Sequence, residues 1–279
     1  MASRCELIST IKHPAVAAAR ESLGQVGGKS ATAFPVDGRR LVAQAVACGA
    51  SVERVFFVDP VEAPEQLELM AAVRQAGIEH YAVTKGVFFR ILGLGYETSV
   101  RVLATVTAQP APLGQIEALA TDQACILIGE RIQDPRNIGV LIRTADAMGL
   151  AAAVFSSDSA NPFSRECVRS STGSIFRVPL GLAGDLAPFI ARLQQNSVRV
   201  IGTSAHAPQA CWDADLLKPC AILLGNETSG LSGAAAAACD ALVAVPMFGG
   251  AHSLNVTVAG GILMCEMNRQ NRRPGAPPL

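Results

Sequence analysis

The segment AILLGNETSGLS, residues 221–232, joins an unbroken apolar run to a turn rich in glycine and small polar residues. The C-terminal part of the chain contains four more apolar runs followed by turns or helix-like stretches: Ala124–Ile128, Ala151–Phe155, Val198–Ile201 and Ala241–Val245. Buried parallel strands show this pattern because helices cover both faces of their sheet. The pattern predicts an open α/β domain, in which ligands bind beyond the carboxyl ends of the strands.

The residues that follow three of these runs are therefore candidates for a site. After the first run the chain reads GERIQDPRNIGVLIRTA, residues 129–145. Asp134 directly before a proline is a typical helix start, because proline is tolerated at the first helical position and aspartate accepts free amide protons. Asn137 then lies near this start, and Gly139 and Arg143 share one helix face. A capped amphipathic helix with one solvated arginine is the alternative interpretation.

The other two segments combine glycine with small polar residues. In GNETSGLS, residues 225–232, glycine lets the backbone approach a ligand closely, and Glu227 follows the carboxyl end of the expected strand. In PMFGGAHSLNVTVAGG, residues 246–261, a glycine-rich loop precedes small and β-branched residues that suit a helix packed closely against another segment. Taken separately, a turn capped by Ser229 and a core helix after a loop are the simpler interpretations.

The composition is that of a globular protein. The chain has 279 residues, of which 50% are hydrophobic and 16% charged, and its mean hydropathy is +0.33, which excludes a disordered chain. The longest uncharged stretch, Ala241–Cys265, is interrupted by proline and glycine and predicts core and loop instead of a membrane span. Residues 1–6 lack the apolar region of a signal peptide, so the expected compartment is the cytoplasm.

Charge and cysteine usage narrow the function classes further. The 8 cysteines never approach C-x-x-C spacing and the 4 histidines show no metal spacing, so neither a disulfide framework nor a metal site is expected. The 23 basic and 23 acidic residues cancel, a mild argument against a nucleic-acid partner, because phosphate binding usually leaves a basic footprint. Any basic surface must be local, and Arg39 with Arg40, or Arg165 with Arg169, could supply it unless these arginines are simply solvated.

The chain is expected to form two domains. Residues 1–106 are predicted as a small α/β domain, 107–120 as a Pro-containing linker, 121–271 as the second α/β domain and 272–279 as a disordered tail. Within the first domain the pattern predicts helices at Leu41–Cys48 and Pro64–Gln75 and strands at Val52–Val58 and His80–Val83.

Taken together, the three segments resemble the motifs of the SpoU/TrmH family of RNA ribose 2′-O-methyltransferases, within the SPOUT superfamily. The patterns are Asn-x-Gly-x-x-x-Arg from Asn137, Gly-Asn-Glu-x-x-Gly-Leu from Gly225, and Pro-Met followed by Ser-Leu-Asn-Val from Pro246. Their order, spacing and placement after strands agree with the family across about residues 124–269, and RSSTG, residues 169–173, resembles a further family element.

The resemblance implies S-adenosylmethionine bound in a trefoil knot, two chains paired across the site as a homodimer, and a small N-terminal RNA substrate-binding domain, whose pattern DGRRLV at residues 37–42 fits. The positions that match cofactor contacts of the family, largely through backbone groups, are Thr203, Gly225, Val245, Met247 and Leu254. The positions that match its active site are Asn137, Arg143, Glu227, Ser253 and Asn255.

The reaction implied is methyl transfer to a ribose 2′-hydroxyl in RNA. A sulfonium methyl is already activated, so an enzyme must align it with the 2′-oxygen and help that oxygen lose its proton. Because a guanidinium is almost always protonated in proteins, Arg143 is expected to stabilise the developing alkoxide or grip a phosphate. Asn137 and Asn255 would orient the ribose, Glu227 could position Arg143, and no metal is required.

Several alternatives stay open. The added N-terminal domain favours ribosomal RNA over transfer RNA as the substrate, but a His-Gln-Gly stretch of some relatives is absent from GYET, residues 95–98, so the target RNA is undetermined. A non-catalytic RNA-binding module is a second hypothesis, against which the intact Asn137, Arg143 and Glu227 argue. A dinucleotide-dependent oxidoreductase, suggested by residues 93–95, is weakened by Thr98 in place of a third glycine.

Overall fold

A computed structural model describes residues 7–24, 33–93, 99–120 and 124–271. The chain divides into two compact units. Unit 1 contains residues 1–109 and 163–176, and unit 2 contains residues 110–162 and 177–279. The expected tail at 272–279 lies outside the described residues. So do residues 94–98, which include part of the glycine pattern behind the oxidoreductase hypothesis and the segment that differs from some relatives.

The two units differ from the predicted domains in two respects. Part of the predicted linker forms helix α5 (Leu113–Leu119) of unit 2, where Ile116 is fully buried. The segment 163–176, expected in the second domain, packs with unit 1. Neither feature follows from local composition, because both depend on contacts with residues distant in sequence.

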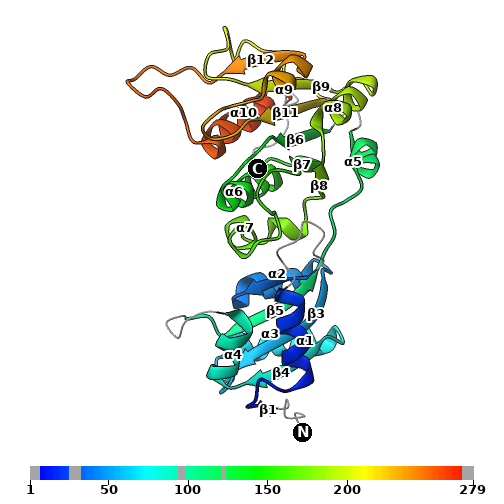
Figure 1. The fold of residues 1–279 in the computed structure, drawn as a ribbon, viewed down its shortest axis with the longest axis vertical. Helices are drawn as coiled ribbons and strands as arrows, with labels where there is room; N and C mark the ends of the chain where they lie inside the picture. Colours follow the sequence, from blue (N-terminus) through cyan, green and yellow to red (C-terminus); the bar gives the residue numbers. More distant parts are fainter. Residues whose placement is uncertain (1–6, 25–32, 94–98, 121–123, 272–279) are drawn as a thin grey trace. The chain divides into compact units, whose positions relative to one another are not determined.

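Unit 2 is a parallel sheet with helices on both faces (Figure 1). Its described strands are β6 (Cys125–Gly129), β7 (Ala152–Ser156), β8 (Leu180–Ala183), β9 (Arg199–Thr203), β10 (Gln209–Ala210), β11 (Cys220–Leu224) and β12 (Ala241–Ala244), in the spatial order β10-β12-β9-β11-β6-β7-β8. Its other described helices are α6 (Pro135–Ala147), α8 (Leu186–Gln195), α9 (Gly233–Ala238) and α10 (Val256–Asn271).

All five strands predicted from apolar runs are present, and every strand pair in this sheet is parallel. The sequence pattern missed β8 and β10. Strand β8 contains Gly181, and Ile116 of α5 packs directly against this glycine. A Cβ at Gly181 would lie 2.5 Å from Ile116 Cδ1, so no larger residue fits there. Strand β10 has only two residues and one of them is polar, which leaves no alternation to detect.

Helices cover each face of the sheet with apolar side chains. One face packs against α5, α8 and α9 through a core that includes Ile128, Phe189 and Leu223. On the other face α6 and α10 pack against each other, and α10 also contacts β11. A Cβ at Gly260 would lie 2.8 Å from Leu224 and 2.9 Å from Leu141, so this glycine permits the close packing expected of the helix after the glycine-rich loop.

Unit 1 contains a mixed five-stranded sheet in the order β1-β4-β3-β5-β2. The strands are β1 (Leu7–Ile8), β2 (Ala33–Asp37), β3 (Ser51–Val58), β4 (Glu79–Val83) and β5 (Val102–Thr107), and the helices are α1 (Pro14–Gly24), α2 (Arg39–Ala47), α3 (Pro64–Gln75) and α4 (Lys85–Leu92). The four elements predicted here match α2, β3, α3 and β4. Among the described helices of the chain, none has the length and hydropathy needed to span a membrane.

Helix α7 (Arg165–Ser171) is held on β2 of unit 1 by a buried ion pair. The Arg165 guanidinium donates to both carboxylate oxygens of Asp37, at 3.3 and 2.7 Å, and the Asp37 side chain is only 1% exposed. Gly173, which follows α7, has φ +96°, and a Cβ there would lie 1.8 Å from the Gln44 side chain of α2. A buried carboxylate needs such a partner, which explains why this segment leaves unit 2.

Candidate functional site

A cavity of about 340 Å³ lies where the chain leaves β9, β11 and β12. This is the edge of the sheet at which ligands of open α/β domains bind, and the volume falls within the range of small-molecule sites. All five positions predicted for the cofactor line the cavity: Thr203, Gly225, Val245, Met247 and Leu254. Of the predicted active-site residues, Glu227 and Ser253 line it as well.

The turn after β11 is built by Asn226. Its Oδ1 accepts hydrogen bonds from the backbone N–H groups of Thr228 and Ser229, at 3.0 and 2.9 Å. Its backbone pairs with that of Gly230, which has φ +68°, a conformation that favours glycine. Gly225 is needed because a Cβ there would lie 2.3 Å from backbone atoms of the Gly230–Leu231 peptide. The motif residues therefore fold the turn back onto the strand that precedes it.

Two residues that the sequence analysis did not single out tie β6 to this turn. The buried carboxylate of Glu130 accepts hydrogen bonds from the Ser232 backbone N–H at 2.7 Å and hydroxyl at 2.6 Å, and Ser232 caps α9. The backbone of Arg131 has φ +52°, its carbonyl accepts from Asn226 at 2.8 Å, and its guanidinium donates to the Gly230 carbonyl at 3.3 Å. Glu130 and Arg131 come directly after a predicted strand, and this position could have marked them as candidate site residues.

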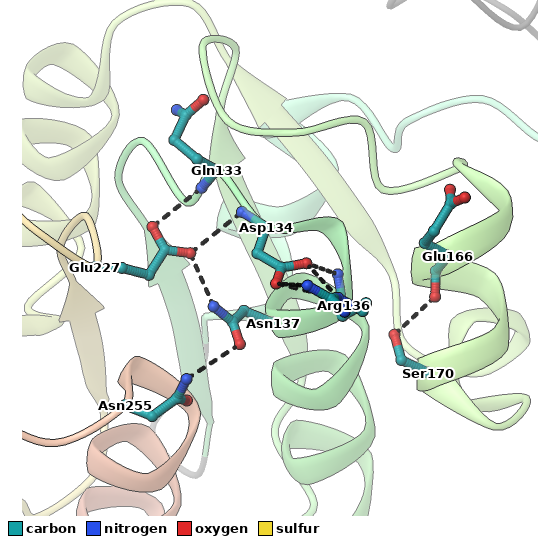
Figure 2. A network of polar contacts seen from close by, with 8 residues as sticks. All are labelled: Gln133, Asp134, Arg136, Asn137, Glu166, Ser170, Glu227 and Asn255. Atoms are coloured by element: carbon teal, nitrogen blue, oxygen red, sulfur yellow. Dashed lines mark hydrogen bonds and ion pairs between the residues drawn. The ribbon is translucent and has the colours of Figure 1, made fainter.

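The Glu227 carboxylate is the centre of a polar network that joins all three motifs (Figure 2). It accepts hydrogen bonds from the Asn137 side chain at 2.9 Å and from the backbone N–H groups of Gln133 and Asp134, at 3.2 and 3.3 Å. The Asn255 side chain in turn donates to Asn137 Oδ1 at 3.4 Å. The expected helix start is confirmed, since Asp134 caps α6 by accepting from the backbone N–H of Arg136.

This network can orient a polar ligand. The Asn137 amide uses one of its two N–H donors for Glu227 and one acceptor position for Asn255, so it retains hydrogen-bonding capacity. Burial opposes ionisation of Glu227, but hydrogen bonds from Asn137 and from nearby backbone N–H groups outweigh it and hold the pKa of this carboxyl below its ordinary value of 4.5. At neutral pH the carboxylate is therefore charged, and it fixes the Asn137 amide with its N–H group toward Glu227.

Arg143 and Ser253 lie apart from this network. Arg143 is exposed on α6 and follows Asn137 by about 9 Å of helix rise and about 120° of rotation. Within the described residues of one copy the Glu227 carboxylate accepts hydrogen bonds from the Asn137 and Asn226 side chains and from backbone N–H groups. That Glu227 positions Arg143 stays a prediction. Ser253 is exposed at the cavity lining.

The lowered pKa of Glu227 predicts a pH-dependent contribution to stability. Because the folded state holds the pKa below the unfolded value, the ionised carboxylate stabilises the fold above pH 4.5, and this contribution disappears as the pH falls through the folded pKa. Urea unfolding between neutral pH and pH 3 is expected to show a smaller acid-induced loss of free energy for Glu227→Gln than for the wild type. The variant Glu62→Gln, which removes an exposed carboxylate from unit 1, is the control. Parallel pH profiles for the wild type and Glu227→Gln would contradict this prediction.

Comparison with known proteins agrees with the three motifs. The sequence profile of the SpoU rRNA Methylase family matches residues 124–265. The 23S rRNA (guanosine(2553)-2′-O)-methyltransferase RlmP of Bacillus subtilis is 32% identical over 235 residues, which cover 84% of this chain and 88% of RlmP.

Solved structures share the fold over nearly the whole chain. The AdoMet-bound rRNA methyltransferase from Sinorhizobium meliloti matches with a TM-score of 0.79 and 26% identity, covering 95% of this chain and 98% of that one. The SpoU methyltransferase AviRb from Streptomyces viridochromogenes, in complex with AdoMet, matches with a TM-score of 0.79 and 27% identity, covering 91% of this chain and 98% of AviRb.

The parallel sheet and the cavity at its carboxyl edge define an α/β protein with a binding site for one small molecule. The chain belongs to the SpoU rRNA methylase family. The family expected from the motifs is thereby confirmed.

Proposed function

We propose that this protein transfers a methyl group from S-adenosylmethionine to a ribose 2′-hydroxyl of RNA, with ribosomal RNA as the substrate. The observation that carries the proposal is that the polar network borders the cavity. Glu227 lines the cavity and accepts a hydrogen bond from Asn137, which in turn accepts one from Asn255. The names of RlmP, a 23S rRNA 2′-O-methyltransferase, and of the AdoMet-bound relatives support both the cofactor and the substrate.

The cavity lining combines apolar and polar side chains and suits a ligand that carries both kinds of group. Leu231, Leu242 and Val245 supply apolar surface for a purine, while Thr203 and His206 supply polar groups. S-adenosylmethionine carries both kinds of group, and when bound it supplies an activated methyl group. The five predicted cofactor positions all belong to this lining, which supports their assignment.

In the proposed reaction the 2′-oxygen forms a bond to the methyl carbon while the carbon–sulfur bond breaks, and the hydroxyl proton leaves to a phosphate or water. Asn137 and Asn255 orient the ribose, Glu227 holds Asn137 in place, and Ser253 contributes at the edge of the cavity. Arg143 stabilises the charge that develops on the 2′-oxygen, because a guanidinium donates hydrogen bonds and stays protonated.

We propose that Arg143 reaches the reacting atoms through a homodimer. Val140, three residues before Arg143 on α6, is 36% exposed, and Val258 and Ile262 on the adjacent α10 are 49% and 38% exposed. Leu254 is exposed as well and lines the cavity, so this apolar surface continues to the site. Pairing of two copies through it would cover these residues and place Arg143 of one copy beside the cavity of the other.

The variant Val258→Asp tests the homodimer. A carboxylate at the centre of an apolar interface is expected to lower dimer affinity at least 10-fold and to reduce methyl transfer in parallel, because burial of an unpaired charge is costly. Sedimentation velocity across protein concentrations measures the association. Leu67→Asp, at a residue of α3 with the same 49% exposure, is the matched control. A wild-type protein that remains monomeric would contradict the proposed pairing.

We propose unit 1 as the RNA substrate-binding domain. Arg40 is exposed and shares a face of α2 with Gln44, whose side chain lies beside Gly173 at the end of α7. Asp37 is already paired with Arg165, and Arg169, 3.6 Å from the same carboxylate, keeps a side chain that is 56% exposed. RNA binding needs a basic surface, and in a chain of zero net charge that surface must be local. These arginines supply it.

Salt dependence of RNA binding tests this assignment. Replacing Arg169 with alanine is expected to weaken binding and to reduce the slope of log K against log salt by about 1, the effect of one lost phosphate contact. Fluorescence anisotropy with a ribosomal-RNA fragment at several salt concentrations measures the slope. Arg20→Ala, at an exposed arginine of α1, is the control, and equal slopes for all three proteins would refute the role of Arg169.

The chain path supports the trefoil knot that the family resemblance implies. The segment after β11 crosses to β12 at the far side of β9, and α10 then returns to pack on α6 and β11. We propose that this return threads the chain through a loop of its own backbone. An experimental chain trace in which α10 reaches α6 without passing through such a loop would exclude the knot.

We place the protein in the cytoplasm, a reducing compartment in which the free cysteines of the described residues stay reduced. Isothermal titration with S-adenosylmethionine, followed by transfer of a tritiated methyl group to separated ribosomal and transfer RNA, tests the function. Binding with transfer to ribosomal RNA is expected. Labelling of transfer RNA alone would favour the other substrate, and a failure to bind the cofactor would favour a non-catalytic RNA-binding module.

A further inference from the structure

Two aromatic side chains are stacked on the surface of unit 2. Trp212 is 48% exposed and Phe248 is 89% exposed, and their ring planes are parallel within 2° with centroids 6.3 Å apart. Trp212 is the only tryptophan of the chain, and eight of its ten phenylalanines are buried. Exposed rings are thus an exception in this molecule. The folded core does not account for them.

The pair is held beside the proposed site. Trp212 follows Cys211, whose backbone N–H donates to the Ala244 carbonyl at 2.8 Å and thereby fixes this segment along the end of β12. Phe248 directly follows Met247, which lines the cavity. Neither ring lines the cavity itself, so the pair lies outside the space proposed for the cofactor. Gly249 follows Phe248 and has no atom of a more distant residue within 4 Å of its Cβ position, so the loop is not closely packed there.

We propose that Trp212 and Phe248 form a stacking site for an unpaired nucleobase of the substrate RNA, close to the ribose that is methylated. This inference rests on the proposed function. A base presents a flat π-face to an aromatic ring, and single-stranded RNA is commonly bound through such stacking. The residues next to the two rings in sequence are Cys211, Asp213, Met247 and Gly249, none of which is a cation that could grip a phosphate. The base is therefore the part of RNA that the rings fit.

Because Trp212 is the only tryptophan, its fluorescence reports directly on this site. Titration of the full chain with a single-stranded RNA of ten adenylates is expected to quench the emission to saturation, whereas a duplex of equal length, whose bases are already stacked, leaves it unchanged. The variant Phe248→Leu keeps an apolar side chain but removes the ring, and it is expected to weaken single-strand binding about 5- to 150-fold. Affinity for S-adenosylmethionine is expected to stay at the wild-type value. Leu217→Ala, at a residue that is 52% exposed, is the control.

Unchanged emission at RNA saturation, or wild-type RNA affinity of Phe248→Leu, would overturn the proposal. A Phe248→Leu protein that dissociates into monomers, with RNA affinity unchanged, would assign the rings to the contact between subunits and also overturn it. The emission reports stacking whether or not methyl transfer occurs. Quenching without transfer would therefore support the stacking site and count against the proposed function alone.

Discussion

Replacing Arg143 with alanine is expected to lower kcat for methyl transfer by about 100- to 1,000-fold, the usual effect of removing one donor that stabilises a developing oxyanion. The side chain is exposed on α6, and its removal leaves no buried group without a partner. The free energy of unfolding is therefore expected to change by no more than about 0.5 kcal/mol. Single-turnover transfer, thermal unfolding and cofactor titration of the same preparation measure the three quantities.

Arg269→Ala on α10 is the matched control, because this arginine is also exposed and its partner Glu266 lies on the same helix. Arg143→Lys is expected to recover part of the lost rate, since lysine keeps the charge but not the planar fork of donors. Wild-type activity of Arg143→Ala would remove this residue from the mechanism. A large loss of stability would assign it a structural role instead.

Replacing Gly225 with alanine is expected to abolish measurable cofactor binding and to lower the free energy of unfolding by about 3 kcal/mol or more. The added Cβ would lie 2.3 Å from the backbone of the Gly230–Leu231 peptide, and backbone cannot move aside as a flexible side chain can. The turn that lines the cavity would have to shift, together with the Glu227 carboxylate that it carries.

Isothermal titration and urea unfolding measure both effects of the Gly225 substitution. Gly249→Ala is the control, because no atom lies within 4 Å of its Cβ position and it lies in the loop that follows Met247. It is expected to bind the cofactor as the wild type does. A Gly225→Ala protein with wild-type stability and cofactor affinity would show that the turn does not need the close backbone approach.

The sequence predicted the parts of the molecule that depend on local patterns. Apolar runs located β6, β7, β9, β11 and β12 because strands buried on both faces leave an unbroken hydrophobic signal. The start of α6 followed from Asp134 before a proline. Both features are encoded within a few neighbouring residues. The five cofactor positions were instead implied by the family resemblance, and they line one cavity.

Apart from the short strand β10, which carries too few residues for a pattern, the features that the sequence did not predict depend on pairs of residues far apart in the chain. The union of segment 163–176 with unit 1 depends on the buried Asp37 and its partner Arg165. The Glu130 contact with Ser232 joins residues 102 positions apart, and nothing in either local sequence indicates the other. The hydrogen bonds of the Glu227 carboxylate to Asn137 and to the backbone N–H groups of Gln133 and Asp134 likewise join segments at least 90 positions apart.

The chemical position of the transferred methyl group tests the central claim most directly. Ribosomal RNA from cells that lack the enzyme would be labelled with tritiated S-adenosylmethionine and then hydrolysed in alkali, which cleaves RNA only where the 2′-hydroxyl is free. We predict that the label is recovered in alkali-resistant dinucleotides and that Arg143→Ala forms them at an initial rate about 100- to 1,000-fold lower. Label recovered in mononucleotides, which would mean methylation of a base, or no transfer by a protein that binds the cofactor and the RNA, would contradict ribose 2′-O-methylation.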